Sequence, residues 1–312
     1  MSRFFLRRLG SILLISLAII FFCALGLRLM RQPLSSGEIS LARLLGGAAS
    51  DSLRFLRELL TGRLGTVTRG QGRSRLTVPV TTVLVNTYMN SMGLLLAAML
   101  FAGFLGILLG TLSAYWEGSP LSMGLLTISL LGVSMPSFFT ALLLQVLEIL
   151  WYRRTGVRLV PVGGFGWDSH LILPALVLSM RPLAQLARIT NVSLSEAAHQ
   201  DYVRTAWAKG LPISQVWGGH VLPNAAVPIL TALGISLRFS LGSLPVVEYF
   251  FAWPGLGATL LDAIRIRQAN LVTSLALALG LTFMLLNLAL ELAYRMLDPR
   301  LREAVVGDDR NE

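Results

Sequence analysis

The chain has 312 residues, of which 54% are hydrophobic and only 13% are charged, and its mean hydropathy is +0.69. A soluble domain carries about twice that share of charged residues, so the composition excludes an ordinary soluble protein. Apolar runs of roughly 20 residues recur along the chain and are long enough to cross the ~30 Å hydrocarbon core of a bilayer as helices. The short alternating segments of a membrane β-barrel are missing from the sequence. We therefore expect an all-α polytopic membrane protein.

The net charge of +10 comes from 25 arginines and a single lysine against 16 acidic residues. Arginines beside apolar runs are usual where a helix meets anionic lipid headgroups. No basic cluster carries a recognition motif for nucleic acid, so we expect the lipid bilayer, and no nucleic acid, as the partner of these charges. Cys23 is the only cysteine, which excludes an internal disulfide and a cysteine metal site. The three scattered histidines predict no metal site.

The N-terminal segment, residues 1–30, is expected to be a retained membrane helix with its apolar run at 9–29. A cleavable signal peptide is the alternative, but the apolar run is too long and no small-residue cleavage site follows it. Residues 31–85 are polar and rich in glycine and arginine. We interpret them as a small soluble connector.

Five further membrane spans are expected in a core over residues 86–297, and a charged tail follows at 298–312. The third span can bend at Pro136, the fourth contains Arg181, and the fifth contains Arg238. The expected spans cover residues 9–29, 88–114, 121–150, 171–189, 225–251 and 271–292. Six spans place both termini on one side of the membrane, but the arginines are spread too evenly to say which side that is.

The stretch SLSEAAHQDYVRTAWAKGLP, residues 193–212, interrupts the apolar runs with charged and polar residues. Ser193 and Glu196 match the S-x-x-E capping box that begins a helix. Gly210 suits the left-handed residue that ends a helix, and Pro212 suits the first turn of the next one. The pattern predicts a helix, a sharp glycine turn and a second helix outside the membrane core.

The predicted helix has a face of mostly small residues, and two charged residues lie elsewhere on its surface. Asp201 and Arg204 are three residues apart and can pair. Two interpretations remain open. The helix can lie amphipathically on the membrane surface, or it can dock a partner protein whose backbone approaches the small residues closely. The face consists of Leu194, Ala197, Ala198, Tyr202 and Ala206.

Several ordered motifs resemble those of one family. Glu196-Ala197-Ala198, Gly210 and Leu222-Pro223 resemble the EAA loop of ABC-transporter permeases. The segments DYVRTAWAKGL, HVLPNAAVPILT, VVEYFFAWPGLGATLLDAI and DPRLR are similar to motifs of the dipeptide/oligopeptide/nickel branch of the binding-protein-dependent permeases. Trp207 departs from that branch, which usually has Arg or Lys at this position. The resemblance covers nearly the whole chain.

The resemblance implies a type I ABC importer permease fold with six transmembrane helices and a small extracytoplasmic connector after the first. It implies that the EAA loop, at 191–223, faces the cytoplasm and docks on an ATP-binding subunit. Both termini are then cytoplasmic, in the plasma membrane of a bacterium or archaeon. The implied partners are a second homologous permease subunit, two ATP-binding subunits and an extracytoplasmic solute-binding protein.

Two groups of residues are candidates for function under this resemblance. Those expected to couple to the ATPase subunit are Glu196, Ala197, Ala198, Asp201, Tyr202, Arg204, Lys209 and Gly210. Those considered for a gate or a polar path are Arg181, Arg238, Glu248, Pro254, Gly255 and Gly257. The two arginines also have a structural alternative, which is snorkelling or pairing with the glutamate.

The sequence contains no P-loop, which requires G-x-x-x-x-G-K-[ST]. Its only lysine, Lys209, is followed by Gly210. We therefore expect that this chain is not an enzyme and binds no cofactor, and that ATP and Mg bind to the partner ATPase subunits. The expected function is a translocation path for peptides or a similar small solute, with a nickel chelate also open. An ion-gradient secondary carrier and a non-transporting scaffold that recruits a soluble partner are the alternatives.

Overall fold

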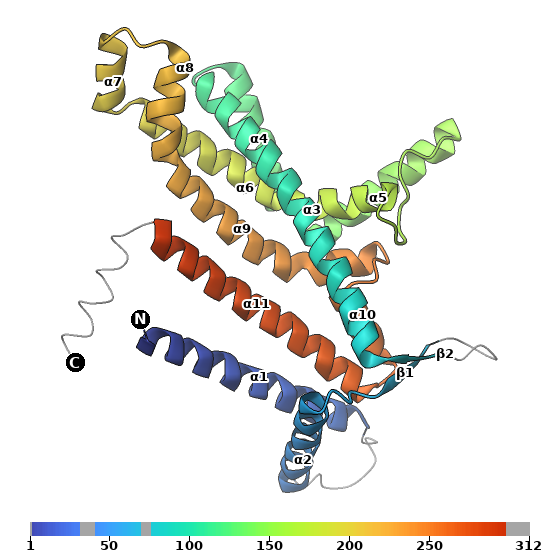
Figure 1. Ribbon diagram of the computed structural model, residues 1–312. Helices are drawn as coiled ribbons and strands as arrows, with labels where there is room; N and C mark the ends of the chain where they lie inside the picture. Colours follow the sequence, from blue (N-terminus) through green and yellow to red (C-terminus); the bar gives the residue numbers. More distant parts are fainter. Residues whose placement is uncertain (1, 32–40, 70–75, 298–312) are drawn as a thin grey trace. The chain divides into compact units, whose positions relative to one another are not determined.

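The computed structural model describes residues 2–31, 41–69 and 76–297, so the expected charged tail at 298–312 lies outside the described residues. Helices dominate, and η1 and η2 are a 3₁₀ turn and a π-helical turn (Figure 1). The elements are α1 Ser2–Arg31, α2 Leu41–Leu60, β1 Thr66–Arg69, β2 Leu76–Pro79, α3 Val80–Tyr115, α4 Pro120–Ser134, α5 Ser137–Thr155, η1 Ser169–Leu171, α6 Ile172–Ala198, α7 Asp201–Ala208, α8 Ile213–Val216, η2 Trp217–Val221, α9 Leu222–Phe250, α10 Leu256–Arg265 and α11 Ala269–Leu297.

The described residues contain five helices that are long and apolar enough to cross a membrane. They cover Leu6–Met30, Val80–Tyr115, Ser169–Ala198, Ile213–Phe250 and Ala269–Ala293. The expected third span, residues 121–150, is instead two helices that are separated at Met135 and Pro136. Pro136 is extended (φ −62°, ψ 141°) and caps α5. A proline has no N–H to continue a helix and disfavours helical geometry at the residue before it, so the break occurs here.

The chain divides into two compact units. Unit 1 comprises Met1–Met92 and Ala252–Leu288, and unit 2 comprises Gly93–Phe251 and Ala289–Glu312. The core of unit 1 is an apolar cluster that joins α1, α2, the β-hairpin, the start of α3, α10 and α11. Its most deeply buried members include Ile20, Phe55, Val67, Val80, Leu256 and Leu275.

In the described part of the connector, the helix α2 is followed by the two strands β1 and β2. β1 and β2 pair antiparallel, with Val67 opposite Val78. α3 begins at Val80, directly after the hairpin, whereas the sequence placed the start of this span at residue 88. The first turns of α3 hold several threonines and an asparagine, which lower the apparent hydropathy. Val80 and Val83 are nevertheless buried in the cluster of unit 1, and their packing stabilises the early start of the helix.

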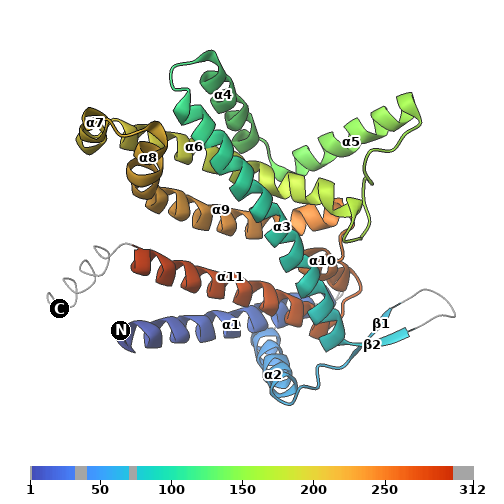
Figure 2. The same ribbon diagram turned by 45° about the horizontal axis from the view of Figure 1, so that its top comes forward.

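The centre of unit 2 is the pair α6 and α9, which lie side by side in both views (Figures 1 and 2). α4 and α5 both pack on α6, and α5 also contacts α9. Leu178 and Leu186 on α6 and Leu244 on α9 are almost completely buried. The pair holds the polar stretch of the sequence at one end, where α6 gives way to α7, α8 and η2.

Candidate functional site

The candidate coupling residues lie in an elbow, which we define as residues 196–212. α6 ends at Ala198, and α7 begins only after Gln200, whose backbone is extended (φ −73°, ψ 151°). Gly210, after α7, has φ +74°, which is the left-handed conformation that the sequence predicts there. Pro212 caps α8. The predicted helix and glycine turn are confirmed by α7 and Gly210. The second helix is not a separate element outside the membrane core, because α8 continues through η2 into α9 as one candidate span, Ile213–Phe250.

The predicted capping box is wrong, because Ser193 and Glu196 lie inside α6. Leu194 and Ala197 are 0% and 7% exposed in this last stretch of α6. A cap at Ser193 would need an extended backbone there and would pull these apolar side chains out of their contacts. The segment predicted as one helix is therefore two, separated at residues 199–200.

Three of the four alanines of the elbow face the inside of unit 2, whereas Ala208 is exposed. Ala197 and Ala206 are buried and Ala198 is partly buried, all against one apolar cluster. The sequence left open whether this face of small residues lies on the membrane or docks a partner. In the structure its alanines let α6 and α7 pack on their own unit. The other buried members of this cluster are Ala114, Leu194, Val203, Val216, Val221, Ala225 and Ile229.

The outward face of the elbow is charged and aromatic. Asp201 Oδ1 lies 3.7 Å from Arg204 Nη1, and their side chains are 97% and 76% exposed. So exposed an ion pair adds little stability, so both charges are available to a partner. The exposed residues of this face are Glu196, Asp201, Tyr202, Arg204, Trp207 and Lys209.

Polar and aromatic contacts join the helices next to the elbow. Asn191 of α6 donates from Nδ2 to Ser113 Oγ of α3 at 3.1 Å, and Ser113 shares a 2.8 Å hydrogen bond with Ser122 of α4. The rings of Tyr115 and Trp217 lie 5.5 Å apart at the start of η2. These contacts tie α3, α4, α6 and η2 together next to the elbow.

The close packing of α3 on α6 depends on two glycines of α3 that the sequence did not lead us to predict. A Cβ at Gly106 would lie 2.8 Å from Leu186 Cβ, and one at Gly110 would lie 2.5 Å from the Ala187 carbonyl oxygen. The G-x-x-x-G spacing is the signal that could have revealed them, since it permits close approach of membrane helices.

Arg181, a candidate path residue, lies on α6 with its Cζ 4.5 Å from the ring centre of Phe239 on α9. This is a cation–π contact, which keeps the guanidinium at the α6–α9 seam. A cavity of about 70 Å³ opens beside it, and Ser137, Thr140 and Ser240 contribute to its lining. The cavity therefore combines one cation with several hydroxyl groups.

Arg238 is half-buried, and its Nε has no hydrogen-bond partner among the described residues. Glu248 is completely buried on the same helix, ten residues further on. Ten residues of α-helix span about 15 Å, which is too far for a direct ion pair. This separation argues against a direct pair of Arg238 with Glu248, and pairing of Arg181 with Glu248 stays a prediction.

Two polar side chains of α5 hold the loop that precedes η1, and the sequence reading missed both. Glu148 is 5% exposed, and its Oε1 accepts from the backbone N–H groups of Leu159 and Val160 at 2.9 and 3.3 Å. Gln145 donates from Nε2 to the carbonyls of Val162 (2.8 Å) and Phe250 (2.9 Å). A glutamine and a glutamate three residues apart in an apolar helix were the available signal.

The same loop ends in a local carboxylate–histidine pair. Asp168 Oδ1 accepts from the backbone N–H of His170 at 3.0 Å and lies 2.7 Å from its Nδ1. The backbone hydrogen bond, and after it the side-chain bond, lower the pKa of Asp168. Asp168 is the residue before η1, so this local pair fixes the start of that turn.

The Pro254–Gly257 turn, a candidate gate, is bonded into unit 1. Trp253 is completely buried and donates from Nε1 to the Asn90 carbonyl at 3.1 Å. Asn90 donates from Nδ2 to the Pro254 carbonyl at 3.0 Å, and the Leu256 N–H donates to Ser91 Oγ at 2.7 Å. Pro254, Gly255 and Gly257 therefore belong to unit 1, whereas Arg181, Arg238 and Glu248 belong to unit 2.

Comparison with known proteins gives consistent similarities. Residues 106–303 match the family described as binding-protein-dependent transport system inner membrane component. The di/tripeptide transport system permease protein DppB of Pseudomonas aeruginosa is 38% identical over 231 residues, which cover 66% of this chain and 68% of that protein. The glutathione transport system permease protein GsiC of Pectobacterium atrosepticum is 34% identical over 252 residues, which cover 80% and 78%.

A solved structure is similar in fold. A chain in the crystal structure of an amino acid ABC transporter with histidines has a TM-score of 0.55 and 15% sequence identity. The similarity covers 69% of this chain and 94% of that chain. At this identity the comparison concerns the fold alone.

Proposed function

Because the chain belongs to the family of binding-protein-dependent transport system inner membrane components, we propose that it is the permease subunit of an ATP-driven importer for peptides or a similar small solute. The observation that carries the proposal is the elbow, a charged and exposed segment between two long apolar helices in a chain without a P-loop. The named relatives, for di/tripeptides and glutathione, favour a peptide over a nickel chelate.

The proposed assembly contains a second homologous permease subunit, two ATP-binding subunits and an extracytoplasmic solute-binding protein. ATP and Mg bind to the ATP-binding subunits, and this chain contributes the membrane path. Energy therefore has to enter the chain through a protein contact. The exposed charges of the elbow are suited to such a contact, because charged rims set the specificity and rate of association.

The proposed topology has six crossings, of which α4 and α5 together make the third. Both termini and the elbow lie in the cytoplasm, and the connector at 31–85 lies outside the cell, in a bacterial or archaeal plasma membrane. The five apolar helices of the described residues support five of these crossings. The break at Pro136 explains why the third has no single long helix.

The proposed coupling route runs along α6. Glu196, Asp201, Arg204 and Lys209 contact the ATP-binding subunit, and Gly210 holds the turn that orients α7. Arg181 lies 17 residues before the end of α6, or about 25 Å along its axis. Since α6 and α9 pack along one another, a tilt of the elbow moves both walls of the seam at Arg181 and Phe239.

The proposed path is polar on this seam. Arg181 and Arg238 offer cationic groups, and a carboxylate of a peptide is their natural counter-charge. The Nε of Arg238 has no hydrogen-bond partner among the described residues, which supports this assignment, because a buried guanidinium nitrogen gains free energy when an acceptor binds it. Glu248 and the turn at Pro254, Gly255 and Gly257 are proposed to act in the outer gate.

A charge-swap experiment tests the docking role of the elbow. The double variant Asp201→Arg/Arg204→Asp keeps an i,i+3 pair and the net charge, but it inverts the pattern that a partner meets. The matched control is Asp262→Arg/Arg265→Asp in α10, where the Nη1–Oδ1 distance is 3.8 Å and the side chains are also exposed. We expect the elbow swap to reduce copurification of the ATP-binding subunit and uptake of a labelled dipeptide, and the control to leave copurification of the ATP-binding subunit intact.

The same assays separate the alternatives. Uptake that resists vanadate and collapses with an ionophore identifies a secondary carrier. A soluble protein that copurifies through the elbow without any solute uptake identifies a scaffold. An ATP-binding subunit that stays bound to the elbow swap, with normal uptake, removes the elbow as the docking site.

A further inference from the structure

The helix α2, in the connector, carries more apolar surface than the protein covers. Its inner face packs on unit 1 through Leu44, Ala48, Ser52 and Phe55. A second set of leucines remains outside this contact and is strongly exposed. This leucine face consists of Leu41 (71% exposed), Leu45 (40%), Leu53 (68%) and Leu60 (87%).

Helical geometry places these leucines together. At about 100° per residue, the four occupy an arc of about 120° next to the inner face. Three arginines, Arg43, Arg54 and Arg57, fall within the following arc of about 60° and are exposed. Around the helix axis, the order is thus inner face, leucine face and arginine face. This order is typical of a helix that lies in a membrane–water interface.

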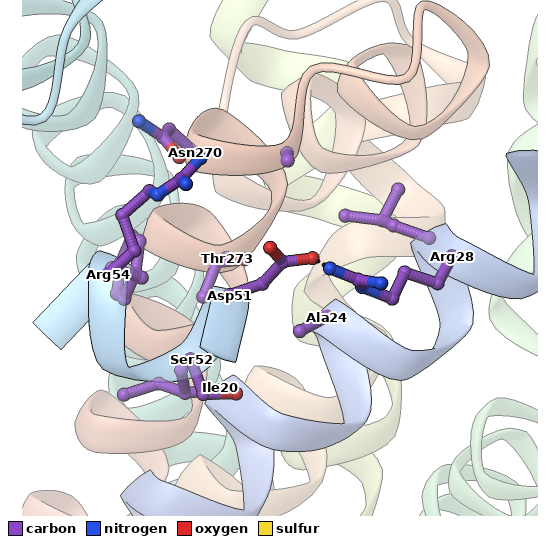
Figure 3. A pocket seen from close by; sticks show the side chains of 11 residues that line it. Ile20, Ala24, Arg28, Asp51, Ser52, Arg54, Asn270 and Thr273 are labelled. Carbon is purple, nitrogen blue, oxygen red and sulfur yellow. Dashed lines mark hydrogen bonds and ion pairs between the residues drawn. The ribbon is translucent and has the colours of Figure 1, made fainter. Parts of the chain in front are cut away.

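The acidic residues of α2 bind side chains of α1 and α11. The outward polar face of α2 is therefore cationic. Asp51 Oδ2 accepts from Arg28 Nε of α1 at 2.6 Å (Figure 3). Glu58 Oε2 accepts from Asn270 Nδ2 of α11 at 2.7 Å. These are the only two acidic residues in α2. An outward face with arginines and no acid complements the phosphates of lipid headgroups.

The position of α2 along the membrane normal follows from the length of the uncharged segment of α1. No charged residue lies between Arg8 and Arg28, and this 20-residue separation corresponds to about 30 Å of helix, the thickness of the hydrocarbon core. Arg28 is therefore at headgroup depth. Since Asp51 is bonded to it, the middle of α2 is at the same depth, and α2 crosses the end of α1 in both views (Figures 1 and 2).

A cavity with a mixed polar and apolar lining lies at this junction, and its polar part is consistent with a position at headgroup depth. It measures about 130 Å³ and opens between the end of α1, the middle of α2 and the start of α11 (Figure 3). Arg28, Arg54 and Asn270 are among its lining residues. Charged and amide groups around an open cavity suit the hydrated headgroup layer and not the hydrocarbon core.

We propose that α2 is an interfacial helix that rests on the bilayer surface where α1 ends, with its leucine face at the boundary of the acyl chains and its arginine face among the phosphates. The occupant of the exposed leucine face is lipid. The connector is then a membrane-bound element that fixes the end of α1 relative to the bilayer. This proposal does not depend on the transported solute or on which side of the membrane the connector lies.

The test measures the depth of single spin labels on the full-length chain, reconstituted with its copurifying subunits in nanodiscs of phosphatidylethanolamine and phosphatidylglycerol. In a Cys23→Ser background, the label is placed at Leu53→Cys on the leucine face or at Ser50→Cys on the arginine face. We expect the ratio of oxygen to water-soluble nickel-chelate accessibility to be several-fold higher at position 53 than at position 50. Nanodiscs expose both membrane surfaces, so the readout is independent of transport.

A second label on the leucine face, at Leu45→Cys, controls for local effects of a single substitution. Its ratio of oxygen to nickel-chelate accessibility should equal that at position 53. Two results overturn the proposal. Equal access of the nickel chelate to positions 53 and 50 means that the leucine face is in water. Exclusion of both oxygen and nickel chelate from positions 45 and 53 means that another protein surface, and not lipid, covers α2.

Discussion

At Gly210 the chain turns with φ +74°, and a Cβ at this position would meet nothing within 4 Å. A side chain here has space, so its cost is the left-handed backbone, roughly 1–2 kcal/mol. We expect Gly210→Val to reach the membrane in normal amounts but to lose most solute uptake, because relief of the strain redirects α7. Uptake by intact cells, normalised to the amount of permease in the membrane, measures this.

Two variants control for the size of the new side chain. Gly210→Asn should retain most uptake, since asparagine tolerates the left-handed region. Gly218→Ala should be normal, because Gly218 is equally open and has no positive φ. Full uptake by Gly210→Val would show that the direction of α7 does not matter for coupling.

Ser91 has a residue-scale role in unit 1 that its sequence context does not reveal. It is fully buried, and its Oγ accepts the Leu256 N–H at the start of α10. Ser91→Ala leaves that N–H without an acceptor and should lower stability by about 1–3 kcal/mol. The thermal unfolding midpoint in detergent should fall, whereas the exposed Ser50→Ala should leave it unchanged. An unchanged midpoint for Ser91→Ala would mean that water or another group replaces the bond.

At the scale of elements, the seam between α3 and α6 depends on the absence of side chains. A Cβ at Gly110 would lie 2.5 Å from the Ala187 carbonyl oxygen and 2.6 Å from Thr190 Cβ. Gly110→Ala should therefore force the helices apart and destabilise the protein by roughly 1–3 kcal/mol. Gly103→Ala is the matched control in the same helix, because its nearest contact would be an ordinary 3.6 Å. Unfolding midpoints that fall equally for both variants would contradict a specific role for this seam.

The elements also show where local sequence signals are overruled. The S-x-x-E pattern at Ser193 is a valid helix start by itself, but burial of Leu194 and Ala197 extends α6 through it. Gly210 and Pro136 behave as the sequence predicts, because their effects are covalent and local. Buried apolar contacts outweigh a helix cap, which contributes about 1 kcal/mol. They cannot supply the N–H that Pro136 lacks, and they cannot remove the clash that a Cβ would make in the left-handed backbone at Gly210.

At the scale of the whole molecule, the proposed orientation has a convenient reporter, since Lys209 is the only lysine and is exposed. An impermeant amine-reactive reagent should modify Lys209 in inside-out membrane vesicles and not in right-side-out vesicles. Mass spectrometry of the fragment that contains this residue gives the result. Bound ATP-binding subunit should reduce the modification, because the elbow is its proposed docking site.

A second label, on the other side of the membrane from Lys209, controls for the orientation of the vesicles. With Cys23→Ser, a cysteine in place of Ser50 in α2 should react with an impermeant maleimide only in right-side-out vesicles. Modification of Lys209 from the right-side-out face would invert the topology, with the connector inside the cell and the elbow outside.

Composition and motif order by themselves determined the class of the protein, the existence of five long apolar helices but not the start of α3 or the end of α6, and the turn at Gly210. These features depend on hydropathy summed over about 20 residues or on one residue's backbone, so no distant contact is needed. Only the tertiary structure decided which face of the elbow is free. In the sequence Ala197 and Ala206 fit either a membrane-surface face or a partner surface, yet they pack inside unit 2, whereas Asp201, Arg204 and Lys209 point outward. The physical reason is that small apolar side chains suit any close helix contact equally well, and the contact they make is chosen by the neighbouring helices that the fold provides.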